Sequence, residues 1–203
     1  MQREEQRCPF RLKIRRAAKK TETLFLPGRT AYAFSLAEML MAIFILAVLA
    51  AIAIPAFSSW LPDYRLKAAA RDMFSTFQLA KQTAVKRNTN CTVCFNQILE
   101  TEAFDYVVFV DADNDLEYDP GEEVMTSRRW SEYGNVAYDL SEGGGDGLRF
   151  VMNDDAYPAI AFTPSGLPVN NSGALGMGTV FLKNTNNRKT KVVVSSAGHI
   201  RIE

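Results

Sequence analysis

The sequence predicts an α+β fold in which one long N-terminal helix is followed by an antiparallel β-rich globular head. Three observations predict it. Residues 34–57 are almost wholly apolar. Directly after them, apolar residues recur every three or four positions, as on one face of an amphipathic helix. From about residue 91 they alternate with a period of two between turn-rich stretches, which is typical of short antiparallel strands.

Charge divides the chain in a similar way. The 203 residues have a formal net charge of zero, but residues 1–33 hold nine Lys or Arg and three Glu, a balance of +6. A cationic segment before an apolar run indicates membrane insertion with that segment left in the cytoplasm. Residues 1–33 are therefore predicted to be a cytoplasmic basic leader. The rest of the chain is acidic, which argues against a nucleic-acid partner because such partners select basic surfaces.

Residues 34–60 are predicted to form a transmembrane helix. No charge interrupts the nineteen residues from Met39 to Phe57. As a helix, the whole apolar run would be roughly 36 Å long, which is enough to cross a hydrocarbon core of about 30 Å. Pro55 falls near the end of the run, where a kink is expected. Trp60 follows at an interface position.

Residues 61–88 are predicted to extend this helix as an amphipathic segment, and residues 89–203 to form the head. The stripe of the helix that faces the core is predicted to comprise Leu66, Ala70, Met73, Phe77, Ala80 and Ala84. The head is predicted to be an antiparallel sheet or a small sandwich. Its candidate strands are residues 91–95, 104–111, 124–130, 135–140, 148–152, 159–163, 178–183, 191–195 and 199–202.

Two cysteines, Cys91 and Cys94, form a C-x-x-C pattern inside the first candidate strand. Strand residues three apart point to opposite faces. Their Cα atoms would be about 10 Å apart, which is beyond the reach of a disulfide. The pattern therefore predicts ordinary buried or half-buried cysteines. A disulfide remains an alternative if the head lies outside the cytoplasm.

Glu38 stands inside the apolar run, although an ionised carboxylate at the centre of a bilayer costs about 2.5–3.5 kcal/mol. A secretory signal peptide does not account for it. The small-residue cleavage site of such a peptide should follow the apolar core, whereas Ala31-Tyr32-Ala33 precedes it. A plain signal anchor explains the basic leader and the apolar run but not Glu38.

The run A-F-S-L-A-E-M-L at residues 33–40, followed by some twenty apolar residues, resembles the prepilin cleavage and methylation signal of type IV pilins and type II secretion pseudopilins. The resemblance implies that prepilin peptidase cuts between Ala33 and Phe34 and methylates the new amine of Phe34. Glu38 and Pro55 would then be mature residues five and twenty-two, and many family members have a helix-kinking proline at the latter. The family prefers Gly before the cut and a shorter leader.

The head carries resemblances of its own. The stretches at residues 109–125, 161–168 and 178–203 resemble parts of the minor pseudopilins of the GspH/FimT type. The resemblance implies a subunit that is anchored in the bacterial inner membrane with its head in the periplasm. It would join other pseudopilins, on an inner-membrane assembly platform, in the short pseudopilus of a type II secretion system. The alternative is a minor pilin of a type IV pilus, acting in pilus assembly or DNA uptake.

Cleavage would give Glu38 a partner. It would create a positive amine on Phe34, four residues before Glu38, and groups at this spacing meet on one helix. The resemblance implies a second pairing, in which Glu38 binds the amine of a neighbouring subunit and draws it into register during assembly.

A cluster of acidic residues precedes the third candidate strand. The residues lie at offsets 0, 2, 4, 6, 8 and 11, which are the ligand offsets of an EF-hand calcium loop. Leu116 occupies the sixth position, where that loop needs Gly, and the flanks read as strands. A solvated acidic loop is the competing interpretation, and a membrane-anchored calcium-binding module is a less favoured function. The candidate calcium ligands are Asp111, Asp113, Asp115, Glu117, Asp119 and Glu122.

Basic residues near the C-terminus form a weaker candidate site for nucleic acid, since phosphate binding needs little more than a local basic patch. Some minor pilins bind DNA through a C-terminal Gly-Arg-x-Arg stretch. The matching residues here are 198–201, with one arginine missing. No enzyme site is identified around the single histidine, His199, and no cofactor other than calcium is suggested. The candidate patch comprises Lys183, Arg188, Lys189, Lys191 and Arg201.

Overall fold

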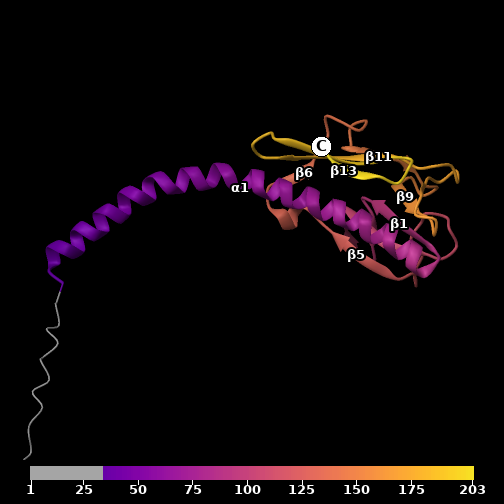
Figure 1. Cartoon of the computed structure of the whole chain (residues 1–203), viewed down its shortest axis with the longest axis horizontal. Coiled ribbons are helices and arrows are strands. Elements are labelled where there is room, and N and C mark those ends of the chain that lie inside the picture. The colour runs from indigo at the N-terminus through magenta and orange to yellow at the C-terminus, as the bar shows by residue number, and fades with distance from the viewer. Residues whose placement is uncertain (1–33) are drawn as a thin grey trace, which may run out of the picture. The chain divides into compact units, whose positions relative to one another are not determined.

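The computed structural model describes residues 34–203, so the predictions for the leader and for Ala33 lie outside the described residues. The chain divides into a short unit that ends at Phe44 and a larger unit, Ile45–Glu203. Helix α1 runs from Leu36 to Arg87, 52 residues in all, and the strands of the head follow it (Figure 1).

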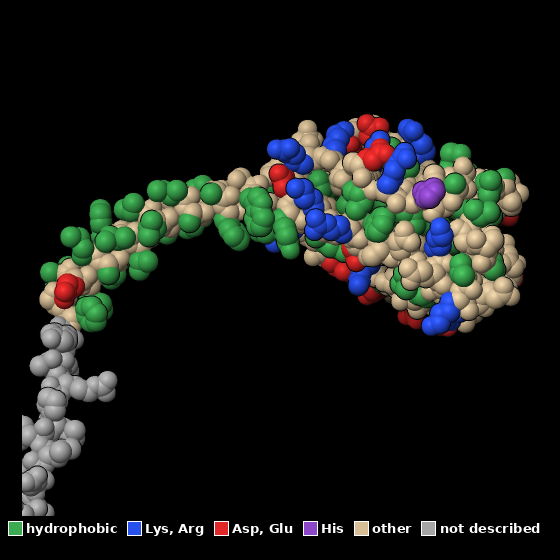
Figure 2. Space-filling view, in the orientation of Figure 1, with side chains coloured by type: hydrophobic (Ala, Val, Ile, Leu, Met, Phe, Trp, Pro, Cys, Tyr) green, Lys and Arg blue, Asp and Glu red, His purple; other side chains and the backbone are tan. Residues whose placement is uncertain are grey.

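The first half of α1 buries nothing. Every residue from Phe34 to Trp60 is exposed, and most of them are large and apolar. Figure 2 shows this surface as a nearly continuous run of hydrophobic side chains. Among the described residues, α1 is the one helix long and apolar enough to cross a membrane. A soluble protein rarely exposes apolar surface of this extent, which therefore requires a lipid or protein partner.

The second half of α1 buries one face, as the periodicity predicted. All six residues of the predicted stripe are buried, together with Ala69, Thr76 and Thr83. Phe77 meets Phe95 and Phe162 edge-on, at ring-centroid distances of 6.4 and 6.3 Å.

The head contains two large antiparallel sheets and one two-stranded sheet. The first sheet has the order β10 (Pro168–Val169), β9 (Pro158–Phe162), β1 (Asn90–Phe95), β4 (Tyr106–Asp111), β5 (Val124–Arg128), and β8 (Val151–Met152) also pairs with β9. The second sheet has the order β13 (Ile200–Ile202), β12 (Lys189–Val194), β11 (Gly178–Asn184), β6 (Val136–Tyr138), and β7 (Leu148–Arg149) also pairs with β11. A small hairpin joins β2 (Ile98–Leu99) to β3 (Glu102–Ala103).

One hydrophobic core joins these layers. The buried face of α1 packs against inward residues of the first sheet, such as Val93 and Ile160, and of the second, such as Val180 and Val192. A second cluster lies on the other face of the first sheet and includes Phe109 and Leu116. The predicted fold class, a long apolar helix followed by an antiparallel β-rich head, is confirmed.

Several predicted strand boundaries were wrong. The strand predicted at residues 124–130 stops at Arg128, because Trp130 begins a 3-10 turn, η1 (Trp130–Tyr133). The strand predicted at residues 148–152 is broken at Phe150 into β7 and β8, which pair with different sheets. The ring of Phe150 stacks on Phe95 at 4.7 Å, so the chain turns at this residue to fill the core.

Cys91 and Cys94 are free and buried in β1. Cys91 belongs to the core under α1 and Cys94 to the cluster on the opposite face, as the strand alternation predicted. Burial raises the pKa of each thiol to about 12. Such thiols remain protonated at neutral pH, and they are poor nucleophiles for that reason.

Candidate functional site

Glu38 closes a capping box at the start of α1. Ser35 stands at the N-cap, and its backbone N–H donates to Glu38 Oε2 at 2.9 Å. The backbone N–H of Glu38 donates in return to Ser35 Oγ at 3.2 Å. This reciprocal pair satisfies two of the backbone donors that a helix start leaves without partners. The S-x-x-E spacing of Ser35 and Glu38 is a capping-box signature in the sequence, and this role of the two residues was not predicted.

The capping box places Glu38 where an amine at Phe34 could reach it. Its carboxylate already sits at the backbone nitrogen of Ser35, the residue after Phe34. A carboxylate has two oxygens and can accept several hydrogen bonds. Glu38 can therefore cap its own helix and still accept from a cationic amine, on this chain or on a neighbour.

The acidic loop is organised around Asp111, the last residue of β4. Asp111 Oδ1 accepts from the backbone N–H of Asn114 at 2.7 Å. Its Oδ2 accepts from the N–H of Leu116 at 3.2 Å and from the hydroxyl of Thr92 at 2.8 Å. Burial raises the pKa of this carboxyl, while these donors oppose the shift. Leu116 has a φ of +65°, so the sixth position bends as a glycine would although its side chain is buried.

The six candidate calcium ligands do not gather at one point. Carboxylate oxygens of Asp111, Asp113 and Asp115 lie within 4.8 Å of one another. Glu117 instead accepts from the backbone N–H of Asp155, and Glu122 accepts from the N–H groups of Ala112 and Asp119. Calcium takes six to eight oxygen ligands, so the placed side chains supply only part of a site. Calcium binding stays a prediction.

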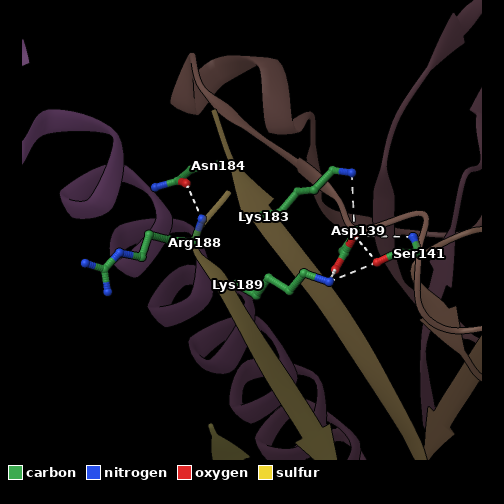
Figure 3. Close-up of polar contacts among 6 residues, drawn as sticks. All are labelled: Asp139, Ser141, Lys183, Asn184, Arg188 and Lys189. Atoms are coloured by element: carbon green, nitrogen blue, oxygen red, sulfur yellow. Dashed lines mark hydrogen bonds and ion pairs between the residues drawn. The ribbon is translucent and has the colours of Figure 1, made fainter. Parts of the chain in front are cut away.

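The five basic residues of the candidate nucleic-acid patch each face a carboxylate. Figure 3 shows Lys183 and Lys189 converging on Asp139, at nitrogen–oxygen distances of 3.5 and 2.6 Å. Glu203 pairs with both Lys191 and Arg201. Arg188 points away from this group, with its Nε 3.6 Å from Asp63 Oδ2. The predicted residues thus lie on one face of the second sheet and its turn, largely neutralised there by acids.

Asp139 is the buried centre of that group, with its side chain only 2 % exposed. Its Oδ1 accepts from the hydroxyl and the backbone N–H of Ser141. The ammonium of Lys189 holds the pKa of Asp139 well below its usual range, and the bonds from Ser141 act in the same direction. A carboxylate held ionised in this way orders the two lysines and reduces what they can offer to phosphate.

The turn between β11 and β12 is hydrogen-bonded to α1 at the end of the exposed apolar run. The side-chain amide of Asn186 donates to the carbonyl of Ser59 at 2.8 Å. The amide of Asn184 donates to Asp63 Oδ1 at 2.7 Å. No periodicity or motif in the sequence signals these contacts, because they join residues more than a hundred positions apart.

Farther along α1, Asp72 ties the helix to the first sheet. Asp72 Oδ2 accepts from the hydroxyls of Tyr133 at 2.6 Å and Tyr106 at 3.1 Å, and Arg128 Nε lies 3.7 Å away. Burial and this carboxylate raise the pKa of both tyrosines. The tyrosines therefore stay protonated and act as donors that fix the orientation of the helix against the sheet.

A long helix whose first half is apolar and exposed, and whose second half packs into the core of an antiparallel β head, is the pilin type of architecture. The family model described as type II transport protein GspH matches residues 69–198. That is more than half of the chain, and the chain belongs to this family.

Two solved structures are similar to the chain. One is the type IV minor pilin FimU of Pseudomonas aeruginosa (strain PAO1), with 14% identity, a TM-score of 0.43, and coverage of 71% of this chain and 92% of that one. The other is the minor pseudopilin EpsH from the Type 2 Secretion System of Vibrio cholerae, with 12% identity, a TM-score of 0.44, and coverage of 68% and 96%. No curated protein matches the chain.

Proposed function

We propose that this chain is a minor pseudopilin subunit of a type II secretion system. Its α1 would anchor it in the inner membrane with the head in the periplasm, and it would then enter a short pseudopilus with other pseudopilins. The observation that carries the proposal is the family match over the head combined with a helix whose first half exposes mainly apolar side chains and carries one charged residue, the capping Glu38. Assembly, with no chemistry of its own, is the action that this arrangement supports.

The second candidate is a minor pilin of a type IV pilus. The architecture favours neither candidate, since both kinds of subunit use it. One observation bears on a DNA-binding version of this candidate. Lys183, Lys189, Lys191 and Arg201 are paired with Asp139 or Glu203. A nucleic-acid surface needs free cations to replace the counterions of phosphate, so this pairing disfavours DNA as the main partner.

Deletion in the native host tests the proposal. We expect the deletion strain to keep folded exoproteins in the periplasm while surface pili and transformation remain normal, and the wild-type gene to restore secretion. Loss of pili or of DNA uptake with normal secretion would favour the second candidate. N-terminal mass spectrometry of the purified protein tests the processing step, since a mature chain that begins at N-methylated Phe34 is expected.

A further inference from the structure

An aromatic stripe marks the place where α1 leaves its apolar half. Phe57, Trp60 and Tyr64 lie three and four residues apart, with ring-centroid distances of 6.1 and 5.3 Å between successive rings. They are 63%, 56% and 53% exposed, so packing within the head does not account for them. Trp and Tyr are enriched where a membrane meets water. The stripe therefore sits at the level of the lipid headgroups if the preceding run spans the bilayer.

The turn between β11 and β12 is held at this same level. Asn186 donates to the carbonyl of Ser59, the residue before Trp60, and Asn184 donates to Asp63. The contacts flank Trp60 on both sides along the helix. These two hydrogen bonds hold the turn between β11 and β12 against α1, beside the aromatic stripe.

This turn presents Arg188. Its backbone N–H donates to Asn184 Oδ1 at 2.9 Å, which fixes the residue, while its side chain is 74% exposed. Figure 3 shows the guanidinium extending away from Lys189 and Asp139. Asp63 Oδ2 lies 3.6 Å from its Nε, and an ion pair of this kind near the surface contributes little. Four N–H groups of the planar guanidinium remain for a bidentate acceptor such as phosphate.

Positive charge exceeds negative charge around Arg188. Lys67 follows Asp63 by one turn of α1. Counting Lys67 with Arg188 against Asp63 gives two positive charges and one negative, a balance of +1. Four other basic residues of the second sheet are paired with Asp139 or Glu203, and Arg149 lies over the ring of Phe181. Arg188 therefore gives the end of the second sheet nearest the apolar run a positive charge that Asp63 offsets only in part.

We propose that this end of the head binds anionic phospholipid headgroups, with Arg188 as the main phosphate contact and the aromatic stripe beside it. The inference rests on the membrane anchoring proposed above and extends it, because anchoring alone requires no lipid of a given charge. Arg188 would hold the head against the bilayer before the subunit enters a filament. The position of Arg188 favours lipid over nucleic acid. The turn that carries Arg188 is hydrogen-bonded to α1 directly after the proposed membrane span, so Arg188 would lie at the membrane surface.

The test uses the full-length protein in phosphatidylcholine vesicles with and without about one third phosphatidylglycerol. Thermal unfolding of the head is followed by near-UV circular dichroism. Anionic lipid is expected to raise the unfolding midpoint of the wild type by about 2–4 °C, and high salt should remove the shift. Arg188→Gln should lose most of the shift.

Arg201→Gln is the matched control. Arg201 is 63% exposed and, like Arg188, faces one carboxylate, so the change in charge is the same. It should keep the wild-type shift. An unchanged shift in Arg188→Gln overturns the inference. So does an equal loss in Arg201→Gln, or an Arg188-dependent shift of the same size with duplex DNA and neutral vesicles, because each shows attraction to any polyanion.

Alkaline carbonate extraction separates this inference from the anchoring on which it rests. A chain that carbonate washes out of the vesicles contradicts the anchoring and the inference together. A chain that stays in the vesicles but unfolds at the same temperature with and without phosphatidylglycerol contradicts the lipid contact alone.

Discussion

Glu38 combines two roles that a single substitution can separate. Its carboxylate accepts from Ser35 N–H in the capping box, and its negative charge is the proposed partner of a subunit's terminal amine. A glutamine keeps the hydrogen-bonding pattern of a capping box but has no charge. An alanine loses both the bond and the charge.

We therefore expect Glu38→Gln and Glu38→Ala to enter the membrane normally and to be recovered with other pilin subunits equally poorly. Cross-linking in the native host followed by co-purification measures this recovery. Ser35→Ala is the control, since it removes the hydroxyl that caps Glu38 N–H and leaves the charge, and it should assemble nearly as well as wild type. Normal recovery of Glu38→Gln would show that capping, rather than charge, is what assembly requires.

Asp139 gives the head a defined response to acid. Its pKa lies below the unfolded value of about 3.9 because of Lys189 and Ser141. The stabilisation is thus fully present above about pH 4 and is lost as the pH falls through the lower pKa of the folded state. Asp139→Asn lacks this contribution at every pH.

The expected result is a lower unfolding midpoint for Asp139→Asn than for wild type at pH 7, and a difference that shrinks steadily below pH 4. Thermal unfolding of the two proteins across this range measures it. Asp146→Asn is a control on the same loop whose carboxylate accepts from Leu148 N–H, without a lysine partner. A gap between Asp139→Asn and wild type that stays constant down to pH 2 would contradict the assignment.

At the scale of elements, two glycine turns meet where the C-terminal hairpin lies on α1. Gly198 has a φ of +73°, and a Cβ there would come within 2.8 Å of the carbonyl oxygen of Gly166. The ammonium of Lys81 donates to the carbonyl of Gly198 at 2.9 Å. Gly166 and Gly198 belong to two of the stretches that resemble the family in sequence. The close contact between the two turns is a physical reason for glycine at position 198.

Gly198→Ala should therefore destabilise the head by about 1–3 kcal/mol, through an unfavourable backbone conformation and a backbone clash. Urea unfolding measures the change. Gly173→Ala offers a matched control, because Gly173 has the same φ of +73° but nothing within 4 Å of the added Cβ. It should cost less. Equal losses at the two positions would show that contact with Gly166 adds nothing.

The elements whose residues follow a local period were predicted correctly from the sequence. Predictions were wrong where contacts between residues distant in the sequence determine the structure. The stripe through Met73 and Phe77 on α1 and the alternation of Cys91 and Cys94 on β1 were both predicted correctly. The break at Phe150 was not, because it depends on Phe95 filling space across the core. Likewise, the spacing of six acidic residues predicted one calcium loop. In the structure, however, the backbone N–H of Asp155 donates to Glu117 and holds it away from the other acids.

The same limit applies to the candidate sites. Ser35 and Glu38 form a local motif that a sequence can show. The sequence predicted a basic patch that includes Lys183 and Lys189. Their neutralisation by Asp139 depends on the pairing of β11 with β6, which places Lys183 opposite Ala137. The charge of a patch is a property of the folded sheet, since acids from other strands enter it.

For the whole molecule, folding and anchoring are divided along α1. No residue from Phe34 to Trp60 is buried, whereas the buried face begins at Pro62 and Leu66. The free energy of unfolding of the head should then depend little on the first half of the helix. The hydrogen bond from Asn186 to the carbonyl of Ser59 marks the first residue of α1 that is hydrogen-bonded to the head.

A fragment of residues 59–203 is therefore expected to be soluble, monomeric and folded, with an unfolding midpoint close to that of the full-length protein in neutral vesicles. A fragment of residues 71–203 is the control, because it removes Leu66, Ala69 and Ala70 from the core. Burying one leucine side chain contributes about 1.5–3 kcal/mol, so this shorter fragment should unfold at a clearly lower temperature or fail to fold. Ultracentrifugation and circular dichroism measure both properties. A longer fragment that aggregates or unfolds as early as the shorter one would show that the apolar half of α1 stabilises the head, and that anchoring and folding are not separate functions of the two halves.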